Sequence, residues 1–234
     1  MATGEFLPEN AIRVLDHGFV RLDDAMASDL SVVNSARVSF GRRKEAMEEA
    51  DEGLVRFLMR DRHGTPFEHN AFRFHIRTPI FVAREWFRHR VGSFNEFSMR
   101  YAKATDDFYV PEPEDVRSQV GKPGAYSFEP VSPELAEVTR EELRTIYETA
   151  YAAYTRLVEQ GVARELARSV IPVGAYTEFY WTVNARALMN FISLRAAETA
   201  QREIQLYAEA VETFFAQKMP VTHAAFVENS RIAP

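Results

Sequence analysis

The stretch FRFHIRTPIFVAREWFRHR, residues 72–90, decides how the fold is built. Its first six residues alternate apolar with basic side chains, which is typical of a strand with one buried and one exposed face. Thr78 and Pro79 then form a typical helix start, because a hydroxyl can cap the helix and proline lacks an N–H that would have no partner there. We therefore predict a half-buried strand followed by a helix over residues 79–90.

The flanking sequence predicts further elements on both sides of this unit. Residues 12–22, IRVLDHGFVRL, are rich in β-branched and aromatic residues around a His-Gly break, so we expect a short hairpin or bent strand. Residues 104–131 are polar and contain four prolines, which predicts a long loop without regular structure. Apolar stripes and aromatic clusters predict a helix at 45–60, a helix from Ser132-Pro133 to Gly161, a short helix at 162–169, a strand at 173–183, a helix after Asn184 and a helix at 204–215 that ends near Pro220.

Long amphipathic helices with a few scattered strands and no regular βαβ alternation indicate the α+β class. We expect a single domain over residues 1–234, with a mixed or antiparallel sheet packed against the helices and a loop-rich segment at about 104–131. The apolar stripe at 204–215 is expected to be core or subunit interface.

The composition excludes several classes of protein. The 234 residues contain no cysteine, which excludes disulfides, thiolate zinc sites and a cysteine nucleophile. A formal net charge of −6 argues against general binding to a nucleic-acid backbone. The sequence has neither an apolar run of about 18 residues nor the basic-then-apolar order of a signal peptide. We expect a cytoplasmic protein that binds neither nucleic acid nor membranes.

Polar side chains are densest between Arg84 and Tyr101, next to aromatic residues that could wall a pocket. In the predicted helix Arg84 and Arg88 share a face, where like charges repel unless an anion lies between them. Gly92, Ser93 and the residues that follow suit a loop around a polar ligand. The same residues would also fit a hydrated basic helix end followed by a polar turn, so the residue types alone leave both interpretations open.

Four ordered motifs resemble those of flavin-dependent thymidylate synthases. Arg88-His89-Arg90, followed after seven residues by Ser98, is similar to the signature of that family. NSARVSF at 34–40, HGTPFEH at 63–69 and TVNARALMNFISLR at 182–195 resemble its other conserved segments. One short match is easily obtained by chance, whereas four in order over nearly the whole chain are highly specific.

The resemblance implies the fold of that family and a reductive methylation. Deoxyuridine monophosphate (dUMP) would receive a one-carbon unit from 5,10-methylenetetrahydrofolate and become dTMP, with FAD as the hydride source and NADPH as its reductant. This chemistry needs no enzyme thiol, which agrees with the absence of cysteine. Because the sequence has no GxGxxG or P-loop motif, FAD would not be held by a Rossmann turn. The resemblance places it between the subunits of a homotetramer.

The resemblance also implies roles for individual residues. The residues expected to bind dUMP are Glu85, Arg88, Glu96, Phe97, Ser98, Met99, Arg100, Arg168 and Arg195. The residues expected to contact FAD are His63, Thr65, Arg88, His89, Arg90, Glu96, Asn184, Arg186 and Asn190. Arg195 is the expected catalytic residue, placed to stabilise negative charge on the uracil ring. We expect no metal site, since the histidines lack a metal-binding spacing.

Two positions depart from the family pattern. Glu85 stands where relatives often have glutamine, so its carboxylate would have to be protonated, paired with an arginine or turned away from the uracil. Met99 stands where a small or polar residue is common, which matters little if its backbone N–H makes the contact. Ser98 has no base at an obvious spacing and is expected to be a phosphate or sugar ligand.

Three alternatives remain open on sequence alone. The arginines and interleaved aromatic residues could form an RNA-binding module, although the acidic balance argues against it. A flavoprotein of the same fold could act on another substrate. Asn184, Arg186, Asn190 and Arg195 could simply cap and bridge helices.

Overall fold

Strand β3, Ala71–Pro79, lies at the centre of a five-stranded antiparallel sheet. In the computed structural model, which describes residues 8–122 and 125–234, β3 pairs with β2, Gly18–Met26, on one side and with β7, Tyr176–Asn184, on the other. Strand β1, Ala11–Val14, and strand β4, Ser93–Glu96, form the edges, so the order is β1-β2-β3-β7-β4. The predicted α+β class and the hairpin near residues 12–22 are confirmed.

The alternating pattern of β3 separates the two faces of the sheet as predicted. Phe72, Phe74 and Ile76 are fully buried on one face. On the opposite face, Nε2 of His75 lies 3.0 Å from a carboxylate oxygen of Glu178 on β7. Burying one apolar face against helices stabilises the sheet and at the same time fixes its register, since a shift by one residue would expose every phenylalanine.

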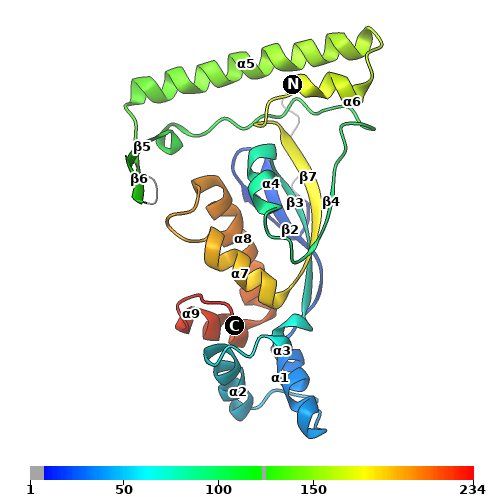
Figure 1. Ribbon diagram of the computed structural model, residues 1–234, viewed down its shortest axis with the longest axis vertical. Coiled ribbons are helices and arrows are strands. Elements are labelled where there is room, and N and C mark those ends of the chain that lie inside the picture. Colours follow the sequence, from blue (N-terminus) through cyan, green and yellow to red (C-terminus); the bar gives the residue numbers. More distant parts are fainter. Residues whose placement is uncertain (1–7, 123–124) are drawn as a thin grey trace.

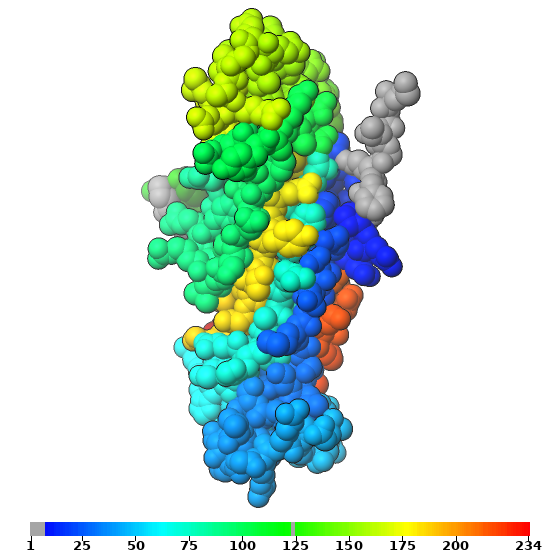
Figure 2. Space-filling model, turned by 90° about the vertical axis from the view of Figure 1, so that its right-hand side faces the viewer, coloured from blue at the N-terminus to red at the C-terminus, as the bar shows by residue number. Residues whose placement is uncertain are grey.

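Helices cover only the apolar face of the sheet, as Figure 1 shows. Helix α4, Ile80–Trp86, helix α7, Ala185–Arg195, and helix α8, Arg202–Lys218, pack there around fully buried aromatic side chains. Figure 2 looks onto the other face, where the bands of β2, β3 and β7 run side by side at the surface. None of the helices among the described residues is both long and apolar enough to cross a membrane.

Two groups of helices lie at opposite ends of the sheet (Figure 1). At one end are α1, Asp29–Arg37, the 3-10 turn η1, Val38–Phe40, α2, Glu49–Arg60, α3, Thr65–Glu68, and α9, Pro220–Glu228. At the other end are α5, Pro133–Glu159, α6, Arg164–Ala167, and the turn η3, Arg168–Val170. The predicted start of α5 is confirmed, because the Ser132 hydroxyl accepts a hydrogen bond from the Leu135 N–H at 3.3 Å.

The predicted helix over residues 79–90 is wrong at both ends. Thr78 and Pro79 still belong to β3, where they pair with Thr177 and Tyr176, and the Thr78 side chain is buried rather than capping a helix. The free N–H groups of Ile80 and Phe81 donate instead to backbone carbonyls of the segment before β7. Helix α4 therefore begins at Ile80, and it ends at Trp86.

The predicted loop at 104–131 contains regular structure. A 3-10 turn, η2, covers Pro113–Asp115, and strands β5, Arg117–Lys122, and β6, Ala125–Pro130, form a separate exposed hairpin. This hairpin carries few buried apolar side chains, so the periodicity that reveals a half-buried strand is missing from it.

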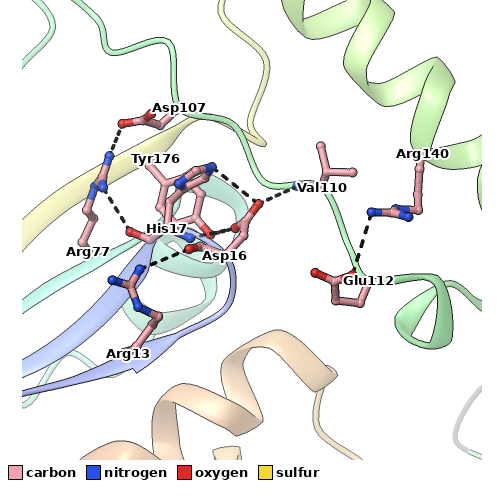
Figure 3. Close-up of polar contacts among 9 residues, drawn as sticks. All are labelled: Arg13, Asp16, His17, Arg77, Asp107, Val110, Glu112, Arg140 and Tyr176. Carbon is pink, nitrogen blue, oxygen red and sulfur yellow. Dashed lines mark hydrogen bonds and ion pairs between the residues drawn. The ribbon is translucent and has the colours of Figure 1, made fainter. Parts of the chain in front are cut away.

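Polar contacts fasten the irregular part of this segment to the turn between β1 and β2 (Figure 3). The Asp16 carboxylate accepts hydrogen bonds from the Val110 N–H at 3.2 Å and from the Tyr176 hydroxyl. Arg77 donates to the His17 carbonyl at 3.0 Å and pairs with Asp107. The segment between β4 and α5 therefore has a fixed path although it lacks helix or strand over residues 97–112.

Candidate functional site

A cavity of about 850 Å³ opens between helix α7 and the chain that follows helix α4. Its lining comes from segments that are far apart in the sequence and are brought together by the pairing of β3 with β7. Of the predicted site residues, those that line it are Arg88, His89, Arg90, Asn184, Arg186, Asn190 and Arg195. Arginine and asparagine thus supply cationic and amide groups to one cavity.

The residues from Arg88 to Arg90 lie beyond the end of helix α4. Phe87 is the C-cap, and backbone hydrogen bonds of the Arg88 and His89 N–H groups close a turn after it. The expectation that Arg84 and Arg88 share a helix face is therefore wrong. Gly92 completes the turn, because a Cβ there would lie 2.8 Å from Nε1 of Trp181 and 2.9 Å from the Thr182 carbonyl oxygen. A side chain at this position would push the arginine segment away from β7.

The guanidinium of Arg195 is held on two sides at the cavity wall. Its Nε donates to Nε2 of His89 at 2.9 Å, and its Nη1 pairs with the carboxylate of Glu85. Of the three possibilities for Glu85, pairing with an arginine is the one that the structure adopts. Arg195 is the last residue of α7 and Glu85 lies in α4, so the pair also bridges the two helices beside the cavity.

The imidazole of His89 is kept neutral by its surroundings. Burial against Phe191, whose ring centroid lies 4.9 Å from that of His89, lowers the pKa of His89, and the nearby Arg195 charge lowers it further, to about 4. An arginine can only donate, so Nε2 of His89 is the acceptor of this hydrogen bond. Of these two hydrogen-bonded side chains, only Arg195 is therefore charged at neutral pH.

The C-terminal motif combines structural and cavity-facing contacts. The Asn184 side chain caps α7 by accepting from the Ala187 N–H at 2.8 Å, which is the role that the alternative interpretation gave it. Arg186 donates to Glu68 at 2.8 Å and to the Pro234 carbonyl at 2.6 Å. The two contacts of Arg186 join the cavity wall to segments outside the motif. The side chains of Asn184 and Arg186 nevertheless line the cavity.

His63 and Thr65 line a second cavity, of about 580 Å³, next to the first. Gly64 lies between them and against Arg186, whose Nε would be 2.4 Å from a Cβ at position 64. The close approach requires glycine there. The two cavities therefore meet at the contact between Gly64 and Arg186.

The predicted loop around the substrate phosphate does not line the cavity that contains Arg195. Glu96 accepts from the Thr177 hydroxyl at 2.9 Å, and the Phe97 N–H donates to the Glu178 carbonyl at 2.8 Å, so the start of the loop follows the sheet edge. The Ser98 hydroxyl accepts from the Arg100 N–H at 3.3 Å. Met99 packs its side chain into a small apolar cluster around Tyr154.

The two remaining predicted arginines converge on Glu165 of α6. Nε of Arg100 lies 3.7 Å from the Glu165 carboxylate, and Nε of Arg168 donates to the Glu165 carbonyl at 3.4 Å. Within one chain, Arg100 and Arg168 therefore lie at α6, apart from the predicted residues that line the Arg195 cavity. Sequence motifs gave no indication of this separation.

Several cavity residues were not predicted from the sequence, among them Glu68, Val91, Trp181 and Leu194. The indole N–H of Trp181 is buried and has no hydrogen-bond partner among the described residues. Glu68 falls within the HGTPFEH motif, so its charge next to a predicted ligand segment was the available signal. Leu194 falls within the TVNARALMNFISLR motif, whereas Trp181 precedes that motif and follows from packing alone.

Comparisons with known proteins agree on one family. The model of the family described as "Thymidylate synthase complementing protein" matches residues 21–221. A flavin-dependent thymidylate synthase of Thermotoga neapolitana is 48% identical over 217 residues, which cover 93% of this chain and 94% of that protein. The enzyme of the same name from Thermosipho melanesiensis is 47% identical over 216 residues, or 92% of this chain and 93% of that protein. The chain belongs to the flavin-dependent thymidylate synthase family.

Solved structures of the family have the same fold as this chain. The UMP/dUMP methylase PolB from Streptomyces cacaoi, in its structure bound with 5-Br UMP, is 44% identical and superposes with a TM-score of 0.87 over 94% of this chain and 97% of that one. Its structure bound with 5-Br dUMP gives a TM-score of 0.86 over 95% of this chain and all of that one. This member of the flavin-dependent thymidylate synthase family is therefore a methyltransferase enzyme.

Proposed function

We propose that the enzyme methylates dUMP to dTMP with a one-carbon unit from 5,10-methylenetetrahydrofolate, using FAD that is reduced by NADPH. The observation that carries this proposal is the cavity into which the separate arginine motifs converge around Arg195. The names of the relatives and the uracil nucleotides bound to PolB support the same reaction class.

The residues of the cavity suit a flavin dinucleotide. Arg88, Arg90 and Arg186 offer guanidinium groups for a pyrophosphate, and the unpaired indole N–H of Trp181 offers a buried donor to a polar ligand. Asn190 adds an amide that can donate and accept. We assign FAD to this cavity, with His63 and Thr65 of the neighbouring cavity at the flavin end. When bound, reduced FAD would supply the hydride that completes the methyl group.

Arg195 would act on the uracil ring by stabilising negative charge as the pyrimidine is activated. Its guanidinium is already oriented by His89 and Glu85, so little reorganisation is needed when charge develops next to it. Nη2 of Arg195 makes no hydrogen bond within the described part of the chain, which leaves a donor for a pyrimidine oxygen. Glu85 would share this arginine with the substrate.

Ser98, Arg100 and Arg168 would bind the phosphate and sugar of dUMP. Within one chain they lie apart from the Arg195 cavity, which supports a site completed by more than one subunit. We therefore propose a homotetramer in which the arginine loop of one chain faces the flavin cavity of another. Arg88 lines the cavity and would reach both nucleotides.

Purified protein tests the proposal directly. It should be yellow, or become so with FAD, and should convert dUMP to dTMP when given methylenetetrahydrofolate and NADPH, with the product identified by chromatography. UMP should be assayed in parallel, because the related PolB is named a UMP/dUMP methylase. A colourless protein that cannot be reconstituted with FAD, or a flavoprotein that leaves both nucleotides unchanged, would contradict the assignment.

A further inference from the structure

A groove that the proposed reaction uses only at its His63 end runs along helix α1 and turn η1. It consists of two cavities of about 580 Å³ each, which share Ser35, Val38 and His69 in their linings. One end of the groove holds His63, which we place at the flavin. The other end holds Arg42. A ligand that starts at the flavin could therefore extend along the groove for its whole length.

The charge of this groove differs from that of the rest of the protein. Arg42 and Arg43 line one cavity and Arg62 lines the other, while neither lining contains a carboxylate among the described residues. The chain as a whole has a net charge of −6. Arg43 lies 3.8 Å from Glu45, but both side chains are more than four-fifths exposed, so this pair is weak. A groove with three guanidinium groups and no carboxylate favours an anionic ligand.

The segment that carries the two arginines is fixed on its C-terminal side. The Asn34 side chain accepts from the Lys44 N–H at 2.8 Å and donates to the Lys44 carbonyl at 3.0 Å. Asp51 is fully buried and binds Arg37 at 2.6 Å and the Lys44 ammonium at 2.7 Å. These contacts, which we call the Asp51 clamp, hold the residue next to Arg43. The arginines therefore project from an ordered backbone, which reduces the entropy lost when an anion binds.

The middle of the groove offers an apolar surface. Val38 lines both cavities and is 70% exposed, and Phe40 beside it in the same turn is 80% exposed. From one end to the other, the groove thus presents a flavin-side histidine, an apolar turn and a pair of arginines. A matching ligand has a ring system, then an aryl group, then an acidic end.

We propose that this groove binds the tail of the folate co-substrate, with Arg42 and Arg43 binding its glutamate carboxylates. A folate consists of a pterin, a p-aminobenzoyl group and one or more glutamates, in the order that the groove requires. The pterin carries the one-carbon unit and has to lie near the flavin and the uracil, so the tail must leave in another direction. The inference rests on the proposed function, because only that function requires a folate.

The test compares folates with short and long acidic tails on the FAD-loaded enzyme. Binding of tetrahydrofolate with one glutamate and with five γ-linked glutamates is measured by anaerobic titration calorimetry. The wild type should bind the pentaglutamate more tightly. In the variant R42A/R43A the dissociation constant of the pentaglutamate should rise roughly tenfold, and most of the preference for the longer tail should disappear. The variant R42K/R43K should restore much of the affinity, because a carboxylate also accepts hydrogen bonds from ammonium groups.

Controls separate this inference from the proposed function. The double variant R144A/R156A removes one half-buried and one exposed arginine of α5 and should bind both folates like the wild type. Flavin absorbance and the KM for dUMP should not change in R42A/R43A. Unchanged folate affinity in R42A/R43A would overturn the inference while dTMP formation persists. A rise in the KM for NADPH instead would also overturn it and would assign the groove to the reductant phosphates. If the wild type itself formed no dTMP, the proposed function would be wrong.

Discussion

Nε of Arg195 donates a hydrogen bond to Nε2 of His89 over 2.9 Å, at the wall of the cavity of about 850 Å³. The geometry requires an imidazole whose Nε2 carries no proton, so the proton of the neutral ring is on Nδ1. One side chain of the Arg88-His89-Arg90 signature is therefore used to orient the arginine that we place at the uracil. The signature and the C-terminal motif act as one unit although about a hundred residues separate them in the sequence.

The ring of His89 should titrate far below an ordinary histidine. Burial and the charge of Arg195 lower its pKa to about 4, so an NMR titration of its ring protons should give a midpoint near that value. Since the unfolded chain takes up this proton below about 6.5, acidification from pH 6.5 to 4 should reduce the free energy of unfolding. The variant H89Q should lose this part of the pH dependence in urea titrations. A midpoint above 6 would mean that the ring is solvated and does not accept from Arg195.

Replacement of Arg195 by alanine should lower kcat by roughly two to three orders of magnitude, as for the loss of one oriented donor to a developing oxyanion. The flavin absorbance spectrum should stay as in the wild type, because the pyrophosphate is assigned to other arginines. Stopped-flow measurements that separate flavin reduction from flavin oxidation would check which step is lost. The double variant E85Q/R195A removes the carboxylate that R195A leaves unpaired, and it should be equally slow. Recovery of turnover in the double variant would show that the unpaired carboxylate, and not the missing cation, caused the defect.

Replacement of Glu85 by glutamine should lower the KM for dUMP about threefold to tenfold. The carboxylate of Glu85 is paired with Arg195 and competes with the substrate for the guanidinium, whereas an amide can accept one hydrogen bond without neutralising the charge. Initial-rate kinetics with dUMP as the varied substrate would measure the effect, with kcat changed by less than a factor of three. A higher KM in E85Q would indicate that the ion pair positions Arg195 for the uracil instead of competing with it.

Replacement of Asp51 by asparagine should destabilise the fold by about 3 kcal/mol, because two cations lose a fully buried partner. Although burial opposes it, hydrogen bonds from Lys44 and Arg37 lower the pKa of Asp51 to about 2. The stabilisation by the Asp51 clamp should thus be complete above pH 4 and be lost as the pH falls toward 2. Urea unfolding of wild type and D51N at pH 7 and pH 3 would measure both effects. Equal stability of the two proteins at pH 7 would exclude the clamp as a stabilising element.

The sequence predicted those parts of the structure in which local pattern and final burial agree. The alternation in β3 and the Ser132 cap of α5 both depend on neighbouring residues only, and both predictions are confirmed. The prediction that a helix starts at Thr78 is wrong because the pairing of Thr78 with Thr177 extends the strand. This partner lies far away in the sequence.

The candidate site was predictable in its members but not in its arrangement. The motifs indicated nearly all the polar cavity residues, because each motif is a short contiguous stretch that can be recognised in the sequence by its residue types and their order. The pairing of Glu85 with Arg195 and the separate placement of Arg100 at Glu165 depend on tertiary contacts. The aromatic wall at Trp181 follows from packing across β7, for which a single sequence gives only a strand prediction.

The ladder between β3 and β7 also determines when the cavity can exist during synthesis. Ala71 pairs with Asn184, so the ribosome must complete more than three-quarters of the chain before the two walls can meet. Closing such a long loop is entropically unfavourable and slow. The apolar face of β2 and β3 stays exposed until α7 and α8 have been synthesised and cover it. A nascent chain released before β7 would therefore have no flavin site and would expose phenylalanines prone to aggregation. Because FAD would bind only the finished fold, its supply would shift the balance from such intermediates toward the native enzyme.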